Sequence, residues 1–168
     1  MKLFLTITSL FILLNSLSLF ALEVGDKAPD VTALTHMNQN FNFKEHYTNG
    51  YFLVFFYPRA NTPGCTAQNK SLRDNFKLLS ESGIQVVGVS TDSVEKQNDF
   101  HKNLNLPFPL ISDEKEVVAK AFGVPVHLGF ASRQAFLINN GKIVWLDHDA
   151  STSAQADDVL KIIKTLKK

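Results

Sequence analysis

The 168-residue chain has a single cysteine, Cys65, and therefore cannot form a disulfide bond within itself. This excludes the disulfide framework that stabilises many small exported proteins. A zinc or copper site built on sulfur is equally disfavoured, and no two of the five histidines are three or four residues apart. We accordingly expect no metal and no other cofactor. The cysteine is either a buried bystander or a reactive group that meets sulfur on another molecule.

The chain also lacks a large net charge, because its 17 lysines and arginines nearly balance its 16 aspartates and glutamates. Nucleic-acid binding usually needs an excess of positive charge, which this balance does not provide, so we expect no nucleic-acid partner. The chain contains no internal repeat, low-complexity tract or interior linker. These features predict one domain over residues 22–168, whose 147 residues (168 minus 21) are enough for a substantial core.

The one long hydrophobic run lies within residues 1–21. Lys2 provides a positive start, residues 3–14 are nearly unbroken apolar sequence, and small residues follow as far as Ala21. This arrangement predicts a secretory signal peptide cleaved after Ala21, and hence export to a bacterial periplasm. A run of about 20 residues is also near the minimum that spans a bilayer, so an uncleaved N-terminal membrane anchor is the alternative.

Apolar runs and helical periodicities alternate along the rest of the chain. In chain order we expect a strand at 31–34, a strand at 51–57, a helix over 67–82, a strand at 84–90, a helix over 91–105, a strand at 108–112, a short helix over 114–122, a hairpin of strands 134–138 and 142–146 with Asn-Gly in its turn, and a helix over 154–166. This order predicts an α/β class with a mixed central sheet flanked by helices, for which a thioredoxin-like fold is the natural candidate.

Cys65 follows the apolar run 51–57 at a strand-to-helix turn. If the next helix begins at Thr62, this threonine is the N-cap, Pro63 is the first helical residue and Cys65 is the third. A capping Thr62 hydroxyl would then lie beside the sulfur, among backbone N–H groups at the positive end of the helix. These surroundings favour a thiolate, and Gly64 would leave the approach to it uncrowded. The placement predicts a nucleophile.

Several chemistries could use such a nucleophile. A disulfide exchanger needs a C-x-x-C pair, but the residue three before Cys65 is Thr62. A hydrolase would need one of the five histidines as its base. The stretch "LDHDAS" around His148 has metal-ligand residue types, although a polar loop after a strand is the commoner explanation. Arg73 could reach the cysteine, but we expect it to pair with Asp74 or another neighbour on its helix.

The spacing Pro58-x-x-x-Thr62-x-x-Cys65 matches the P-x-x-x-T/S-x-x-C signature of the peroxiredoxins, which are thiol peroxidases with a thioredoxin fold. Further stretches, in order, resemble the bacterioferritin-comigratory (peroxiredoxin Q) branch: "VGDKAPDVTAL", "FFYPRANTPGCTAQ", "SLRDNF", "VVGVSTDSVEKQNDF", "PLISDE" and "AFGV". The resemblance extends from about Leu22 to the last helix.

This resemblance implies reduction of hydrogen peroxide and organic hydroperoxides. Cys65 would be the peroxidatic thiolate, which attacks the peroxide and becomes a sulfenic acid. Thr62 would hydrogen-bond the sulfur and the peroxide, and Arg133 in "SRQAFLINNGKIVW" would stabilise the thiolate and the leaving oxygen. Pro58 would shield the pocket from water, and Gly64 would help to shape it.

The sequence departs from this branch at Lys70, where many members carry a resolving cysteine. A one-cysteine mechanism follows, in which the reductant is an external thiol: a thioredoxin-like protein, glutaredoxin or glutathione. The enzyme would be a monomer or a homodimer. Two other functions stay open, namely a redox-sensing or binding module that forms a mixed disulfide without turnover, and a Cys-His hydrolase.

Overall fold

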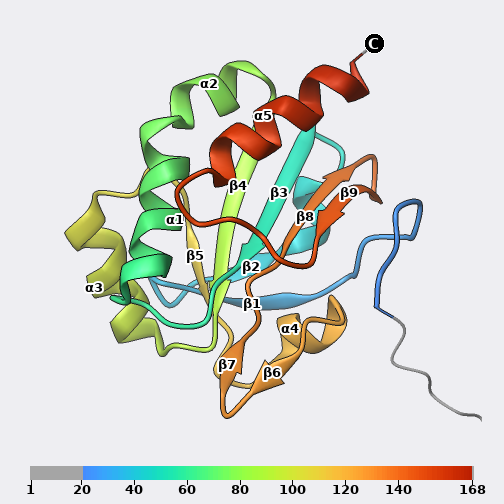
Figure 1. Ribbon diagram of the computed structural model, residues 1–168. Coiled ribbons are helices and arrows are strands. Elements are labelled where there is room, and N and C mark those ends of the chain that lie inside the picture. The colour runs from blue at the N-terminus through green and yellow to red at the C-terminus, as the bar shows by residue number, and fades with distance from the viewer. Residues whose placement is uncertain (1–20, 168) are drawn as a thin grey trace, which may run out of the picture.

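A seven-stranded mixed sheet organises residues 21–167, the part of the chain that the computed structural model describes (Figure 1). Its strand order is β2-β1-β5-β4-β3-β8-β9. The strands are β1 (Thr32–Thr35), β2 (Asn40–Asn42), β3 (Tyr51–Phe56), β4 (Ile84–Ser90), β5 (Leu110–Ser112), β8 (Ala135–Asn139) and β9 (Lys142–Asp147). Strands β3, β4 and β5 run parallel, and the other pairings are antiparallel. The predicted α/β class and mixed sheet are confirmed.

The central strand β3 is buried on both faces, which explains its continuous apolar sequence. Its side chains alternate between two cores. Leu53 and Phe55 belong to one core and Phe52, Val54 and Phe56 to the other. The apolar run thus fits β3 as an interior strand of the sheet, between β4 and β8, and the loop after it leads to the helix that carries Cys65.

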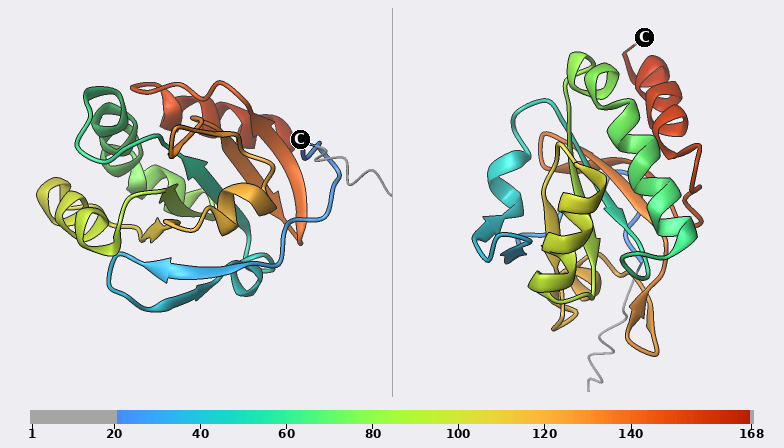
Figure 2. Two further views of the ribbon diagram at one scale, coloured as in Figure 1. Left: turned by 90° about the horizontal axis from the view of Figure 1, so that it is seen from below. Right: turned by 90° about the vertical axis from the view of Figure 1, so that its left-hand side faces the viewer.

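Helices cover both faces of this sheet (Figure 2). One face packs against α1 (Pro63–Asp74), α2 (Phe76–Glu81), α3 (Val94–Leu104) and α5 (Gln155–Leu166). The other packs against the 3-10 helix η1 (Phe43–His46) and α4 (Val117–Ala121). A small separate hairpin, β6 (Val126–His127) with β7 (Phe130–Ala131), precedes β8. Cys65 lies in the first core, beneath the start of α1.

The sequence prediction was wrong in one helix and incomplete in several short elements. The single helix expected over 67–82 is two helices, α1 and α2, separated at Asn75. Asn75 leaves helical geometry and its side-chain amide donates to the carbonyl of Ser71 at 3.0 Å, a local bond that competes with helix continuation. Strands β2, β6 and β7 and the helix η1 were not expected, because elements of two to four residues carry no periodicity.

The remaining elements lie close to their predicted positions. The β8–β9 hairpin turns at Asn140 and Gly141, which both have positive φ angles, 48° and 74°. This is the geometry for which Asn-Gly turns are selected. The predicted signal peptide or anchor falls almost wholly on residues 1–20, outside the described residues. Within residues 21–167, no helix is both long enough and apolar enough to cross a membrane.

Candidate active site

The nucleophile's helix begins where the sequence predicts. Thr62 has an extended backbone (φ −91°, ψ 152°) and is the N-cap of α1, and Pro63 is the first helical residue. Proline suits this position because its missing N–H would have no helical partner there. Cys65 is accordingly the third residue of the helix, at the end where the helix dipole is positive.

The Thr62 side chain does not make the predicted capping bond. Its oxygen accepts no N–H from the first turn of α1, which has no side-chain cap, and its hydroxyl donates to the carbonyl of Arg59 at 2.9 Å. A hydroxyl has one proton to donate, and Thr62 donates it to Arg59 in the preceding loop. Within the described residues, no hydrogen bond joins Thr62 to the sulfur of Cys65. The Thr62 oxygen nevertheless keeps its acceptor capacity and is only half-buried.

Cys65 is much less accessible than the sequence suggested. Its exposed fraction is 1%, and it packs with Tyr57, Ala60 and Leu72. Side chains in the first turn of a helix lean back toward its N-terminus, and here that direction leads under the loop from β3. At this exposure only a small reactant can approach the sulfur without displacing its neighbours. A bulkier partner has to displace part of the first turn of α1.

Arg133 is nevertheless brought to the sulfur. It lies in the connection between β7 and β8, and its Nη2 atom donates to Cys65 Sγ at 3.4 Å. None of the ion pairs in the described part of the chain involves Arg133. Its positive charge is therefore not neutralised by a carboxylate and remains directed at the sulfur. The pairing predicted from the resemblance is present in the structure.

Gly64 occupies the point where Arg133 meets helix α1. A Cβ atom at this position would lie 3.3 Å from Arg133 Nη2 and 3.5 Å from Thr152 Cγ2. The sequence analysis expected an open approach to the sulfur here. The structure corrects this expectation, because the space left by the missing side chain is filled by the guanidinium. Gly64 thus shapes the site by admitting Arg133.

Pro58 begins the loop that carries Thr62. The N–H of Tyr57 still bonds the carbonyl of Val89 at 3.0 Å, and Pro58 ends this ladder. Asp92, at the end of β4, fixes the next part of the loop, since its Oδ2 accepts from the N–H of Ala60 at 2.7 Å. The sequence analysis missed this role of Asp92, because Asp92 and Ala60 are 32 positions apart.

Two buried glutamines complete the surroundings of Arg133, and the sequence analysis missed both. Gln68 Oε1 accepts from Arg133 Nη1, and Gln68 Nε2 donates to Gln155 Oε1 at 2.8 Å. Both glutamines have an exposed fraction of 0%. Gln68 could have been found, since it lies one helical turn after Cys65 and so shares its face. No sequence signal points to Gln155, which is 87 residues away from Gln68.

The alternative sites lose their support. His148 Nδ1 faces Gln134 Oε1 at 3.3 Å, and residues 21–167 contain no group of three or more histidine, cysteine or acidic side chains placed to hold a metal. In the same residues no histidine is hydrogen-bonded to Cys65, so the hydrolase lacks its base. Arg73 contacts Asp74 at 2.7 Å, which confirms its predicted ion pair.

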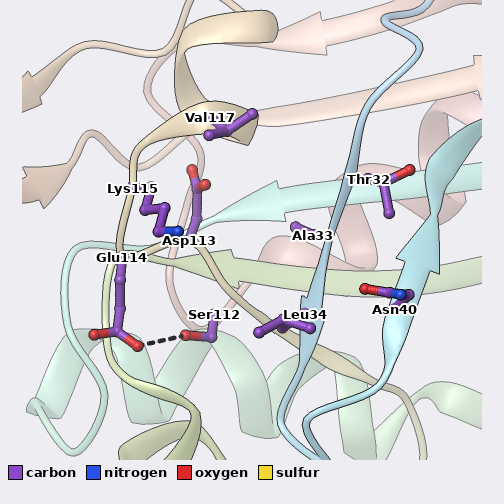
Figure 3. Close-up of a pocket in the computed structure, with 9 residues that line it drawn as sticks. All are labelled: Thr32, Ala33, Leu34, Asn40, Ser112, Asp113, Glu114, Lys115 and Val117. Carbon is purple, nitrogen blue, oxygen red and sulfur yellow. Dashed lines mark hydrogen bonds between the residues drawn. The ribbon is translucent and has the colours of Figure 1, made fainter.

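A cavity of about 510 Å³ lies elsewhere, between β1, β5 and the start of α4 (Figure 3). Its most buried acid is Asp113, whose two oxygens accept from the N–H groups of Val118 and Ala119 at 3.0 and 2.8 Å. Burial raises the pKa of this carboxyl. Asp113 therefore holds the first turn of α4 through both carboxyl oxygens, and the cavity includes none of the site residues named above.

Comparison with known proteins connects the geometry to a family. The family model described as AhpC/TSA family matches residues 24–146. Peroxiredoxin Bcp of Escherichia coli (strain K12) is 38% identical over 151 residues, which cover 85% of this chain and 96% of that protein. The chloroplastic peroxiredoxin Q of Sedum lineare is 36% identical over 119 residues, covering 68% of this chain and 64% of that protein.

Solved structures agree with this likeness. The crystal structure of peroxidoxin BcpB from Mycobacterium tuberculosis has a TM-score of 0.80 at 31% identity, covering 86% of this chain and 98% of that one. A structure of the Xanthomonas campestris bacterioferritin comigratory protein, described in connection with alkyl peroxide reduction, has a TM-score of 0.78 at 26% identity. It covers 88% of this chain and 98% of that one.

Proposed function

The chain belongs to the AhpC/TSA family of peroxiredoxins, in its Bcp and peroxiredoxin Q branch, and from this membership we propose that Cys65 is the peroxidatic residue of a one-cysteine peroxidase. A thiol-dependent peroxidase needs one reactive sulfur, and Cys65 is the only cysteine. The observation that carries the proposal is the contact between Arg133 Nη2 and Cys65 Sγ at 3.4 Å.

In the first step the Cys65 thiolate attacks one peroxide oxygen. An S–O bond forms, the O–O bond breaks, and its electron pair leaves on the other oxygen. That oxygen takes up a proton and departs as water, or as an alcohol when the substrate is an organic hydroperoxide. The sulfur is oxidised by two electrons to a sulfenic acid, and the peroxide is reduced by two.

Arg133 is suited to both charges in this step. The negative charge begins on sulfur and ends on the departing oxygen, so a cation fixed beside the sulfur stabilises the transition state without reorganising. The guanidinium presents several N–H donors in a rigid plane, so one can hold the sulfur while others face the substrate. The N-terminus of α1, which carries Cys65, adds partial positive charge.

Thr62 and Pro58 complete the proposed pocket. The Thr62 hydroxyl donates its proton to the carbonyl of Arg59. Its oxygen can still accept a hydrogen bond from the peroxide. Pro58 is half-buried beside the buried Tyr57 and has no N–H to bind water. We assign to Thr62 the orientation of the peroxide and to Pro58 the exclusion of solvent.

An external thiol completes the cycle. The first thiol attacks the sulfenic sulfur, water leaves, and a mixed disulfide forms on Cys65. A second thiol then releases Cys65 as a thiol and takes the disulfide with it. The position of the family's resolving cysteine holds the exposed Lys70, so both sulfurs come from the reductant. A dithiol protein supplies both at once, and glutathione supplies them one at a time.

The deciding experiment mixes the purified protein with one equivalent of hydrogen peroxide per chain in the absence of thiols, because excess peroxide would oxidise the sulfenic acid further. We expect one peroxide consumed per chain and a product that is one oxygen heavier, with the oxygen on Cys65. Cys65→Ser should consume none while keeping its circular dichroism spectrum and unfolding midpoint. Consumption by this folded variant, or continued turnover of the wild type without a thiol, would overturn the proposal.

The reductant is found by adding candidates one at a time to the oxidised protein. We expect steady turnover with a thioredoxin-like protein, glutaredoxin or glutathione. If Cys65 forms a lasting mixed disulfide with all three and never turns over, the protein acts as a redox-sensing module.

We also propose that residues 1–21 direct export to the periplasm of a bacterium. The support is the sequence pattern alone, a positive start followed by an apolar run and small residues. Mass spectrometry of the protein recovered from fractionated cells tests this. A periplasmic chain that begins at Leu22 supports export and cleavage, a membrane-bound chain that retains residues 1–21 supports the anchor, and a cytosolic chain contradicts both.

A further inference from the structure

Three side chains from separate parts of the chain form a buried line of hydrogen bonds behind the site. Arg133 Nη1 donates to Gln68 Oε1, and Gln68 Nε2 donates to Gln155 Oε1 at 2.8 Å. We call this line the amide relay. Gln68 lies on α1 and Gln155 is the first residue of α5, and the two helices pack side by side (Figure 1).

The relay works in one direction only. A guanidinium has donors and no acceptor, so the Gln68 amide must present its oxygen to Arg133. Its NH₂ group then faces Gln155, which must in turn present its own oxygen. If the Gln155 oxygen were absent, the buried Gln68 NH₂ would lose its acceptor, and the Gln68 amide would no longer be held in the orientation that receives Arg133.

The amide relay ends in an unsatisfied hydrogen-bond donor on Gln155. Gln155 Nε2 is buried and has no hydrogen-bond partner among the described residues. An unsatisfied buried donor is destabilising, and here it accompanies the bond that Gln155 Oε1 accepts from Gln68. A glutamine kept at such a position is explained if its oxygen is needed, since the fold itself gains nothing from the unpaired NH₂ group.

The two glutamines of the amide relay are uncharged. A carboxylate at position 68 would also hold Arg133, but it would neutralise the guanidinium at the same time. An amide oxygen fixes the guanidinium by hydrogen bonding and leaves its full positive charge for Cys65 Sγ, 3.4 Å from Nη2. The amide relay thus positions Arg133 without neutralising its positive charge.

We propose that Gln155 is a positioning residue for the peroxidase reaction, acting through Gln68 on Arg133. The packing of α5 on α1 then sets where the guanidinium stands. A second contact holds the same junction, because the N–H of Ala156 donates to Ser71 Oγ at 3.1 Å. This inference rests on the proposed function, in which Arg133 stabilises the charge on sulfur and on the departing oxygen.

The test compares the wild type with Gln155→Met, a variant of similar volume that removes both the acceptor oxygen and the unpaired donor. We expect the unfolding midpoint to change little, because the variant removes the unpaired NH₂ group of Gln155 but leaves the NH₂ group of Gln68 without its acceptor. The second-order rate constant with hydrogen peroxide should fall about fivefold, the equivalent of one net hydrogen bond. A rate equal to that of the wild type in a folded variant would overturn the proposal.

A readout independent of peroxide separates this inference from the proposed function. The pH profile of Cys65 alkylation by iodoacetamide reports how strongly the surroundings favour the thiolate. A looser guanidinium should move this profile to higher pH in Gln155→Met. If the wild type fails to react with peroxide and the alkylation profile still moves, the relay stands and the peroxidase assignment falls. An unmoved profile contradicts the relay.

Two further variants remove structural explanations. Val118→Ala shortens a buried side chain on α4, in the core on the other face of the sheet, and should lower the unfolding midpoint without changing the rate constant or the pH profile. In a Gln68→Met background, Gln155→Met should cause no further loss of rate, since Gln155 acts only through Gln68. Independent, additive losses in this double-mutant cycle would overturn the proposed route.

Discussion

The guanidinium of Arg133 donates a hydrogen bond to the sulfur of Cys65 at 3.4 Å, although the two residues are 68 positions apart. Helix α1 brings the sulfur to the end of β3, and the connection from β7 to β8 brings the cation, because β8 is the antiparallel neighbour of β3. Gly64 provides the space in which the two meet. The contact between Arg133 and Cys65 is therefore a product of strand pairing.

Replacing Arg133 by lysine should separate charge from geometry. Lysine keeps the positive charge, but its single nitrogen cannot contact both the Gln68 oxygen and the sulfur in a fixed plane. A hydrogen bond to a charged group contributes about 1.5–3 kcal/mol, so we expect the peroxide rate constant of Arg133→Lys to fall about 10- to 150-fold. Arg133→Met, which loses the charge as well, should fall further. Stopped-flow measurements with hydrogen peroxide check the order, and equal rates for lysine and methionine would show that the charge contributes nothing.

Gly64→Ala should affect activity more than stability. The new Cβ would press on Arg133 Nη2 from 3.3 Å and move the guanidinium by a few tenths of an ångström. We expect the peroxide rate constant to fall about three- to tenfold, below the hundredfold that a full 1 Å displacement can cause. The unfolding midpoint should stay the same or rise, because alanine is the better helix former.

Gly88→Ala is the matched control and should show the opposite pattern. Its Cβ would lie 2.7 Å from Phe55 Cζ and 2.8 Å from Leu110 Cδ2, inside the core and away from Arg133. Overpacking of this kind destabilises by about 1–3 kcal/mol. Urea unfolding should reveal this loss, and the peroxide rate constant of the folded protein should be unchanged. A slow Gly88→Ala enzyme would show that the Gly64 effect is not specific to Arg133.

Lys70→Cys should change the product of the reaction with peroxide from a sulfenic acid to a disulfide. Positions five apart on a helix are too distant for a disulfide, so the bond to Cys65 can close only if the first turns of α1 open. After one equivalent of peroxide we expect this variant to become two hydrogens lighter, where the wild type becomes one oxygen heavier. Lys70→Ser, measured in parallel, should behave as the wild type does. A Lys70→Cys product that keeps the added oxygen would show that α1 stays closed.

The stability of the protein should decline in mild acid because of His36. Its ring is 5% exposed, stacks on His101 at 3.8 Å and accepts a hydrogen bond from the N–H of Leu110. Burial, with a contribution from His101 and a smaller one from Lys102, lowers the pKa of His36 from 6.5 to about 4. Between these values the unfolded chain binds a proton that the folded chain does not. The free energy of unfolding should therefore fall as the pH decreases from 6.5 to about 4.

His36→Asn tests the assignment of this pH dependence. The asparagine oxygen can still accept from the Leu110 N–H, but the side chain does not titrate. Urea unfolding at pH 7 and pH 4.5 should show a smaller difference for this variant than for the wild type. His127→Gln, at an exposed position, should leave the difference unchanged. A difference that survives intact in His36→Asn would assign the effect to other groups.

Sequence patterns were sufficient for most of the longer elements of the fold and for the position of Cys65 near the start of a helix. Continuous apolar runs identify β3 and β4, and the N-cap Thr62 followed by Pro63 identifies the start of α1. These features are local, because strand burial, helix periodicity and capping depend on residues a few positions apart. The resemblance to the peroxiredoxins added Arg133, which no local pattern would single out.

The tertiary structure alone decided how these residues meet. It buried Cys65, turned the Thr62 hydroxyl toward Arg59, and brought Gln155 to Gln68 across 87 positions. A side chain forms whichever hydrogen bond its folded neighbours offer, and those neighbours come from strands and helices distant in the chain. The order of residues by itself determined that one sulfur stands at the head of a helix, and the packing of α5 and β8 against α1 and β3 determined which groups surround it.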